Sequence, residues 1–166
     1  RLPVYTWENQ GDKLIKEENE WQKVINEKNK FCSFIVKNDN QKRTWKRISF
    51  FQKLSKYKTV DSGGGAFNNL GYRVKDKVEF CKPYKFALTF ENQLSREYTT
   101  EKIVHAMLSR CVPIYWGNPD VTKEFNPKSF INVHDFKSDE DAIKHIIEVD
   151  QNPTLFGQYL KEPFFY

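Results

Sequence analysis

The side chains best suited to bind and polarise a ligand are concentrated in residues 90–102 of the 166-residue chain. The apolar pattern predicts a helix that begins at Thr99, and the free N–H groups and positive dipole end of a helix attract anions. Lys102, in the first turn of that helix, would add a full positive charge. Because the helix dipole disfavours a cation there, the position of Lys102 predicts an anionic partner, and a diphosphate would suit it.

Two neighbours of Lys102 could bind other parts of a nucleotide. Glu101 could accept hydrogen bonds from a ribose diol, and Tyr98 could stack on a base or reach a phosphate with its hydroxyl. The same residues also fit a simpler interpretation, in which Glu101 and Lys102 are solvated helix residues and Tyr98 packs locally. Their spacing alone does not separate the two interpretations.

The elements that must position these residues are predicted from hydrophobic periodicity, which alternates between strand and helix along the chain. Apolar runs predict strands at residues 31–36, 59–61, 85–90, 112–116 and 129–133. Helical spacing predicts helices or helical turns at residues 11–29, 44–57, 74–80, 99–109 and 120–125, a helix after Ser138 and a last short helix after Asn152. Ser138 followed by Asp141 resembles a capping box, which marks a helix start.

This alternation predicts the α/β class: one Rossmann-like parallel sheet with helices on both faces, forming a single domain over residues 1–166. Such sheets bind ligands at the carboxyl ends of their strands. The loops to consider are therefore those that follow Val36, Asp61, Phe90, Trp116 and Val133.

A run of three glycines, Gly63, Gly64 and Gly65, follows the second predicted strand. Glycine adopts positive φ at little cost, so the run predicts a sharp, flexible turn. The alternative is a cradle for a phosphate, but the run is neither GxGxxG nor a Walker sequence. The turn is the favoured interpretation, and the cradle stays open.

The composition excludes some classes of protein and leaves others. Hydrophobic residues make up 39% and the net charge is +5, which favours phosphate-bearing ligands, anionic membranes or nucleic acid without choosing among them. No nucleic-acid-binding motif is present, so nucleic acid is not an expected partner. No apolar run is long enough to cross a membrane, and residues 1–7 do not resemble a signal peptide, so the piece is expected to be soluble.

The cysteines and histidines give little indication of a metal site. Cys32, Cys81 and Cys111 are far apart in the sequence and are expected to be reduced core thiols. No CxxC or HExxH pattern accompanies them, and no Asp-x-Asp motif lies near the predicted nucleotide site to hold a divalent ion there, so no metal is expected. Among the histidines only His134 is kept as a weak candidate for catalysis.

Several segments together resemble one enzyme family. They are residues 84–92 (YKFALTFEN), 98–102 (YTTEK), Ala106 and residues 113–117 (PIYWG), followed by 125–130 (FNPKSF) and 132–136 (NVHDF). This set is similar to the signature of the alpha-1,3-fucosyltransferases, above all the bacterial members. The resemblance extends from about residue 31 to residue 136 and implies the fold of the C-terminal, donor-binding half of a two-domain glycosyltransferase.

The resemblance implies a role for five residues. Lys102 matches the family lysine that contacts the donor diphosphate, and Glu101 matches the glutamate that holds the ribose. Tyr98 matches a tyrosine at the nucleotide, and Asn92 matches a donor-site asparagine. Arg47 matches, less closely, a helix arginine that also reaches the diphosphate. By charge, Arg47 and Lys102 could stabilise the leaving diphosphate without a metal, since fixed cations that meet developing negative charge lower the barrier.

The activity implied is an inverting transfer of L-fucose from GDP-fucose to an N-acetylglucosamine-containing glycan, with no other cofactor. The resemblance suggests that the transfer belongs to lipopolysaccharide synthesis or to protein glycosylation. For a bacterial member it implies a cytoplasmic location, with peripheral association at the inner membrane as an option. The family's acceptor domain and proposed general base would lie outside this chain, so the chain alone should bind GDP but turn over poorly.

Two other functions remain open from the sequence. One is a transferase for a different nucleotide sugar, such as a UDP- or ADP-sugar. The other is a non-enzymatic α/β module that binds a polyanion or a protein through its basic surface. The loop at residues 93–97 departs from related bacterial sequences, so Arg96 and Glu97 inherit no role.

Overall fold

The computed structural model describes residues 11–37, 41–65 and 67–166, and it contains one parallel sheet with helices on both faces. Five strands in the described residues follow the order β2-β1-β3-β4-β5. They are β1 Lys30–Phe34, β2 Val60–Ser62, β3 Tyr84–Leu88, β4 Val112–Tyr115 and β5 Ile131–Asn132. All neighbouring pairs are parallel. The predicted α/β class and parallel sheet are therefore confirmed.

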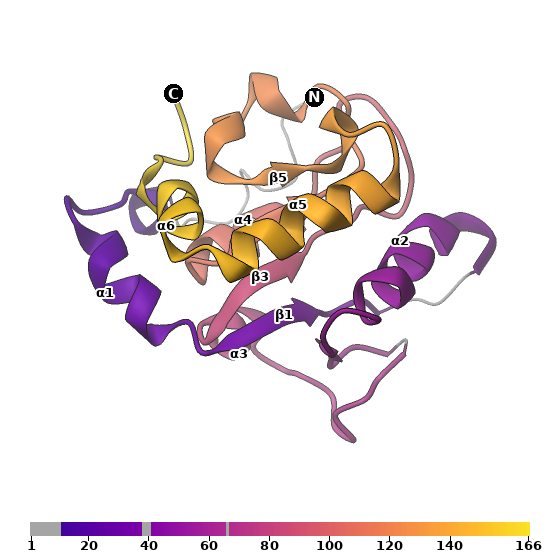
Figure 1. The fold of residues 1–166 in the computed structure, drawn as a ribbon. Helices are drawn as coiled ribbons and strands as arrows, with labels where there is room; N and C mark the ends of the chain where they lie inside the picture. Colours follow the sequence, from indigo (N-terminus) through magenta and orange to yellow (C-terminus); the bar gives the residue numbers. More distant parts are fainter. Residues whose placement is uncertain (1–10, 38–40, 66) are drawn as a thin grey trace.

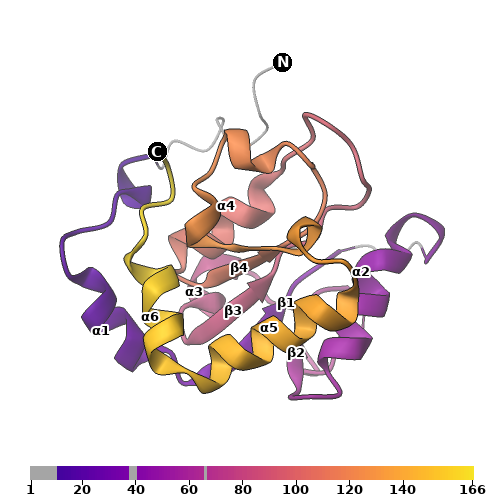
Figure 2. The same ribbon diagram turned by 45° about the horizontal axis from the view of Figure 1, so that its top comes forward.

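The helices pack on the two faces of this sheet. They are α1 Glu20–Glu27, α2 Gln41–Leu54, α3 Lys77–Cys81, α4 Glu101–Leu108, α5 Asp139–Gln151 and α6 Pro153–Lys161. Side chains of α2, α5 and α6 share the largest buried apolar cluster with the strands, whereas those of α3 and α4 belong to two smaller clusters. Figures 1 and 2 show α5 crossing one face of the sheet and α4 lying behind the other.

The helix caps read from the sequence are present. The Ser138 hydroxyl accepts a hydrogen bond from the N–H of Asp141 at 3.1 Å, so α5 begins where the capping box predicts. At the start of α6, the Asn152 side chain accepts the N–H groups of Thr154 and Leu155. These local contacts explain why the last two helices were predicted at nearly the right positions.

The single helix predicted for residues 11–29 is wrong. The chain instead forms a 3-10 turn at Gly11–Leu14, then a loop, and then α1 at Glu20–Glu27. Asn19 has a φ of 63°, which is left-handed and cannot continue a helix. The loop lets the ammonium of Lys16 reach the carbonyls of Leu160 and Glu162, and it leaves Ile15 71% exposed.

The fifth strand is shorter than predicted, at Ile131–Asn132 instead of residues 129–133. On each side of this strand, an asparagine side chain stabilises a turn of the chain. The Asn126 side chain accepts the N–H of Lys128, and the Asn132 side chain accepts the N–H of His134. These contacts produce the 3-10 turns at Pro127–Ser129 and Val133–Asp135.

The glycine run after β2 does bend, at Gly64 and Gly65, but without the positive φ that the turn prediction rested on, and it also serves close packing. None of the three glycines has positive φ. A Cβ on Gly64 would lie 2.0 Å from the carbonyl oxygen of Val36, so the run passes directly against the end of β1. The N–H groups of Gly63 and Gly65 donate to the carbonyls of Phe34 and Val36, which removes two donors from the alternative phosphate cradle.

The three cysteines lie buried as free thiols, in agreement with the sequence. Burial raises the pKa of the Cys111 thiol to about 12, which makes it a poor nucleophile. In the described part of the chain, no helix is long and apolar enough to cross a membrane.

Candidate functional site

A polar pocket of about 320 Å³ lies at the carboxyl ends of β1 and β3, between α2 and α4. It contains all five residues singled out in the sequence, although they come from three different elements. The lining residues are Ile35, Val36, Lys37, Arg47, Lys77, Asn92, Tyr98, Thr100, Glu101 and Lys102. The edge of the sheet at which the sequence places a ligand therefore does carry a built pocket.

Arg47 enters this pocket from α2 and is only 2% exposed. Its Nη1 donates a hydrogen bond to the side-chain oxygen of Asn92. Burial lowers the pKa of the guanidinium and the nearby Glu91 carboxylate counteracts this, so Arg47 remains protonated. A helix position that could have been a solvated surface charge is thus a buried cation with a fixed orientation.

Lys102 has an anionic partner, but that partner belongs to the protein. Its Nζ lies 3.0 Å from Oε2 of Glu91 and 2.8 Å from the hydroxyl oxygen of Thr100. The Glu91 side chain is fully buried. The prediction that Lys102 requires an external anion is therefore corrected, since Glu91 already offsets the unfavourable dipole interaction.

Glu101 lies beside Lys102 and is half-buried. Burial acts to raise the pKa of its carboxyl, but Lys102, the backbone, Lys77 and His105 together hold it below the usual range. Glu101 is consequently ionised at neutral pH and can accept hydrogen bonds from hydroxyl groups.

Two further cations line the pocket that the sequence did not single out. Lys37 follows β1 and Lys77 begins α3, whereas Arg47 and Lys102 come from α2 and α4. Among the residues that the structure describes, four cationic side chains and one carboxylate thus line the pocket. An excess of positive charge within so small a volume suits a ligand with several negative charges.

The residues of the loop between Asn92 and Tyr98 do not all line the pocket. Tyr98 is partly buried and lines the pocket, whereas Arg96 is 78% exposed and pairs with Asp120 at 3.7 Å. Leu94 is also largely exposed. Arg96 therefore lies outside the pocket lining, as its lack of a match to the family suggested.

His134 lies at the end of β5 and does not line this pocket. Its Nε2 accepts the N–H of Gly117 at 3.2 Å, and its ring stacks on Trp116. Burial lowers the pKa of the imidazole, although the Asp135 carboxylate opposes this shift. The histidine thus connects the ends of β4 and β5.

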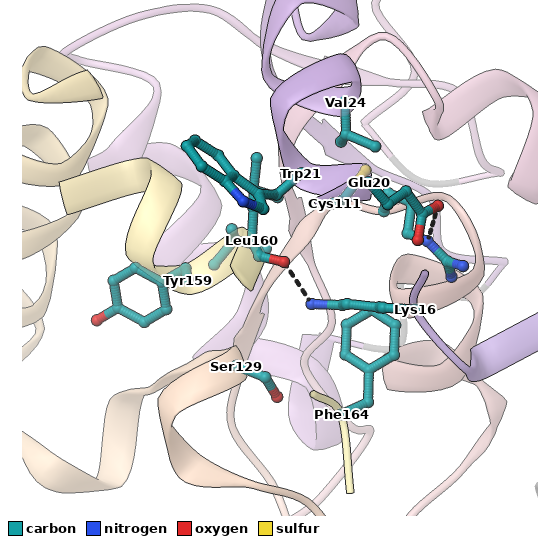
Figure 3. Close-up of a pocket in the computed structure, with 11 residues that line it drawn as sticks. Lys16, Glu20, Trp21, Val24, Cys111, Ser129, Tyr159, Leu160 and Phe164 are labelled. Carbon is teal, nitrogen blue, oxygen red and sulfur yellow. Dashed lines mark hydrogen bonds and ion pairs between the residues drawn. The ribbon is translucent and has the colours of Figure 1, made fainter. Parts of the chain in front are cut away.

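Two other hollows lie at the opposite end of the molecule, near α1 and α6. One is a cavity of about 10 Å³, roughly the space for one water. Figure 3 shows the Lys16 side chain there, lying against the ring of Phe164 with its ammonium directed at the Leu160 carbonyl. The other is an open groove of about 710 Å³ along residues 14–19 and 163–165, with exposed Glu17, Glu18 and Lys161. Neither reproduces the convergence of buried cations seen at the carboxyl edge.

The described residues contain no group of three or more His, Cys, Asp or Glu side chains arranged to hold a metal ion. The pocket's own residues offer a different chemistry. Two partly or fully buried cations, Arg47 and Lys102, are held by hydrogen bonds and can meet negative charge without first reorganising.

Comparison with known proteins identifies relatives of this chain. Residues 25–162 match the model of the C-terminal part of glycosyltransferase family 10 (fucosyltransferase), a longer match than the motifs alone suggested. An alpha-(1,3)-fucosyltransferase of Helicobacter pylori is 49% identical over 132 residues, covering 80% of this chain and 27% of that protein. The 4-galactosyl-N-acetylglucosaminide 3-alpha-L-fucosyltransferase 9 of Mus musculus is 34% identical over 136 residues, covering 80% of this chain and 36% of that protein.

A solved structure of an alpha1,3-fucosyltransferase with GDP-fucose has the same fold. It superposes with a TM-score of 0.79 at 41% identity, covering 84% of this chain and 43% of the other. The chain thus spans less than half of each of these relatives. The family match, the sequence identities and the shared fold agree. The chain therefore belongs to glycosyltransferase family 10, the fucosyltransferases, and matches the C-terminal part of these proteins.

Proposed function

We propose that residues 1–166 form the donor-binding domain of an inverting fucosyltransferase that uses GDP-fucose. The observation that carries the proposal is the pocket at the carboxyl edge, in which Arg47, Lys102, Lys37 and Lys77 converge. The family assignment and the related structure with GDP-fucose support the choice of donor.

In this proposal each of the five predicted residues acts on one part of the donor. Arg47 and Lys102 hold the diphosphate and stabilise the negative charge that develops on it when the bond to fucose breaks. Glu101 accepts hydrogen bonds from the ribose hydroxyls, and Tyr98 and Asn92 contact the nucleotide. The buried position of Arg47 and the hydrogen bonds of Lys102 support these roles, because they fix both cations in advance.

We further propose that the acceptor and the general base are supplied by a part of the protein outside these residues. Among the described residues Glu101 is the one carboxylate that lines the pocket, and it is assigned to the ribose. The acceptor is proposed to be an N-acetylglucosamine-containing glycan, in line with the name of the Mus musculus relative. The glycans of lipopolysaccharide and those of glycoproteins are both proposed as acceptors.

The location proposed for a bacterial protein of this kind is the cytoplasm, with peripheral contact to the inner membrane. The net charge of +5 supports attraction to an anionic lipid surface. Binding to anionic but not to neutral vesicles, weakened by added salt, is the result expected from a sedimentation assay.

A thermal-shift series tests the proposed donor. GDP should raise the melting temperature of the chain in the presence of a chelator, since the pocket supplies its own cations, and UDP and ADP should raise it less. Greater stabilisation by UDP or ADP than by GDP would favour a transferase for another nucleotide sugar. A flat response to every nucleotide, together with salt-sensitive binding to heparin, would favour a polyanion-binding module.

A further inference from the structure

Glu91 is a buried charged residue with no role assigned so far in the proposed reaction. It lies three residues after the end of β3, and its side chain is 0% exposed. Its backbone N–H donates to the carbonyl of Trp116 at 2.8 Å, which fixes the residue between the ends of β3 and β4. Because it is fully buried, Glu91 cannot itself contact a ligand in the pocket.

The carboxylate of Glu91 is directed at the start of α4. Oε1 accepts the backbone N–H of Thr100 at 2.8 Å, and the Thr100 hydroxyl lies 3.0 and 2.7 Å from the two oxygens. Oε2 also accepts from the ammonium of Lys102 at 3.0 Å. One carboxylate therefore holds both the backbone and the side chains of the first turn of α4.

These contacts restrict the orientation of Lys102. An ammonium has three N–H donors, and within the described residues two of them are engaged, by Glu91 and by the Thr100 hydroxyl oxygen at 2.8 Å. Two fixed hydrogen bonds set the direction of the third N–H. Since Lys102 lines the pocket and Glu91 lies beneath it, the third donor remains for a ligand.

Gly117, at the end of β4, provides the space that Glu91 occupies. Its φ is 155°, and a Cβ at this position would lie 2.5 Å from Cγ of Glu91. Only glycine therefore allows the carboxylate to lie under α4. The packing shows that the position of Glu91 depends on two strand ends and one helix together.

We propose that Glu91 is a positioning residue for Lys102, which it holds with one N–H directed at the diphosphate of the donor. The inference rests on the proposed function, since it presupposes a diphosphate in this pocket. Its physical reason is that a flexible lysine would otherwise have to be ordered by the ligand, whereas a pre-oriented cation needs no reorganisation when the leaving group develops charge.

The negative charge of Glu91 has a second, opposite effect, because it weakens the positive potential that attracts the diphosphate. The two effects differ in their dependence on Lys102. Repulsion acts on the ligand directly and persists when Lys102 is replaced, whereas positioning acts only through Lys102. A double-mutant cycle therefore separates them.

The test measures the Kd for GDP by calorimetry for the unaltered chain, Glu91→Gln, Lys102→Met and the double variant. With Lys102 present, Glu91→Gln should weaken GDP binding by about 10-fold, which corresponds to one charged hydrogen bond. In the Lys102→Met chain the same substitution should leave the Kd unchanged or lower it slightly, because only the repulsion is removed.

Equal weakening in both backgrounds would overturn the inference and show that Glu91 only supports the fold. Equal tightening of GDP binding in both backgrounds would overturn it in favour of pure charge repulsion.

Thr100→Val gives a second route if Glu91→Gln does not fold, since it removes the hydroxyl that engages Lys102 but keeps the shape and the backbone N–H. It should weaken GDP binding about 3-fold with Lys102 present and have no effect without it. Lack of any GDP binding by the unaltered chain would instead overturn the proposed function, and the inference with it.

Discussion

Arg47 on α2 donates a hydrogen bond to the side-chain oxygen of Asn92, which lies 45 residues further along the chain, in the loop after β3. This bond joins two residues that line the carboxyl-edge pocket and come from different segments of the chain. Arginine presents a rigid planar fork of donors, which can bond Asn92 and still direct other N–H groups at an anion.

Arg47→Lys should therefore weaken GDP binding by about 10- to 100-fold, even though the positive charge is kept. Lysine is a compact point charge without the fork, so it cannot bond Asn92 and a phosphate with the same geometry. Calorimetric titration with GDP measures the change. Arg96→Ala is the matched control, because Arg96 is 78% exposed and lies outside the pocket lining, and its affinity should equal that of the unaltered chain. If the Arg47→Lys chain binds GDP with unchanged affinity, Arg47 does not belong to the proposed site.

The assignment of Glu101 to the ribose gives a selective prediction. Glu101→Gln should weaken GDP binding by about 10-fold, because a charged acceptor for the ribose hydroxyls is lost. The same variant should bind 2′,3′-dideoxy-GDP as well as the unaltered chain does, because that ligand has no hydroxyls to hold. If Glu101→Gln weakens both ligands equally, Glu101 acts on another part of the nucleotide.

The sequence predicted the fold closely where short-range patterns decide it. Buried parallel strands are continuous apolar runs, and the caps at Ser138 and Asn152 mark their helices within a few residues. It also placed Asn92, Tyr98, Glu101 and Lys102 at a pocket, because all four lie in the loop between β3 and α4 or in the first turn of α4, at the carboxyl edge of the sheet.

The remaining features depend on contacts between distant segments. Glu91 was missed because its inward position requires Gly117, which follows the neighbouring strand β4. Lys77 was missed because a lysine at the start of a helix gives no sign that it lines a pocket. The close packing of the glycine run was missed for a related reason. Glycine permits both positive φ and close approach, and only the position of Val36 decides between them.

Gly64→Ala should destabilise the chain by about 2–4 kcal/mol. The added Cβ would lie 2.0 Å and 2.6 Å from backbone atoms of Val36, which cannot rotate away as a side chain could. Urea denaturation of both chains gives the free energy of unfolding. Gly11→Ala provides the control, since a Cβ there meets nothing within 4 Å, and its stability should change little. Equal stability of the two variants would mean that the end of β1 is not packed against Gly64.

The stability of the chain should depend on pH through Lys16. Burial, followed by repulsion from Arg110, lowers the pKa of this amine to about 8, although Glu20 and Glu162 oppose the shift. Between about pH 8 and 10.5 the unfolded chain binds more protons at Lys16 than the folded chain does, so stability rises with pH in this window. The penalty for burying the charged amine is fully present below pH 8.

Comparison with Lys16→Met isolates this contribution from the tyrosines that titrate nearby. The unaltered chain should gain about 1–3 kcal/mol relative to the variant as the pH rises from 7.5 to 10, after allowance for partial solvent screening. Unfolding free energies of both chains at several pH values provide the measurement. Parallel curves for the two chains would show that the amine titrates normally in the folded state.

The central claim is that the carboxyl-edge pocket binds the diphosphate of GDP, and calorimetric titration of the chain with GDP tests it most directly. We expect saturable heat for one site per chain, a weaker response to UDP and ADP, and clearly weaker GDP binding by Lys102→Ala with an unchanged fold by circular dichroism. No saturable heat with GDP, or the same affinity in Lys102→Ala as in the unaltered chain, would contradict it.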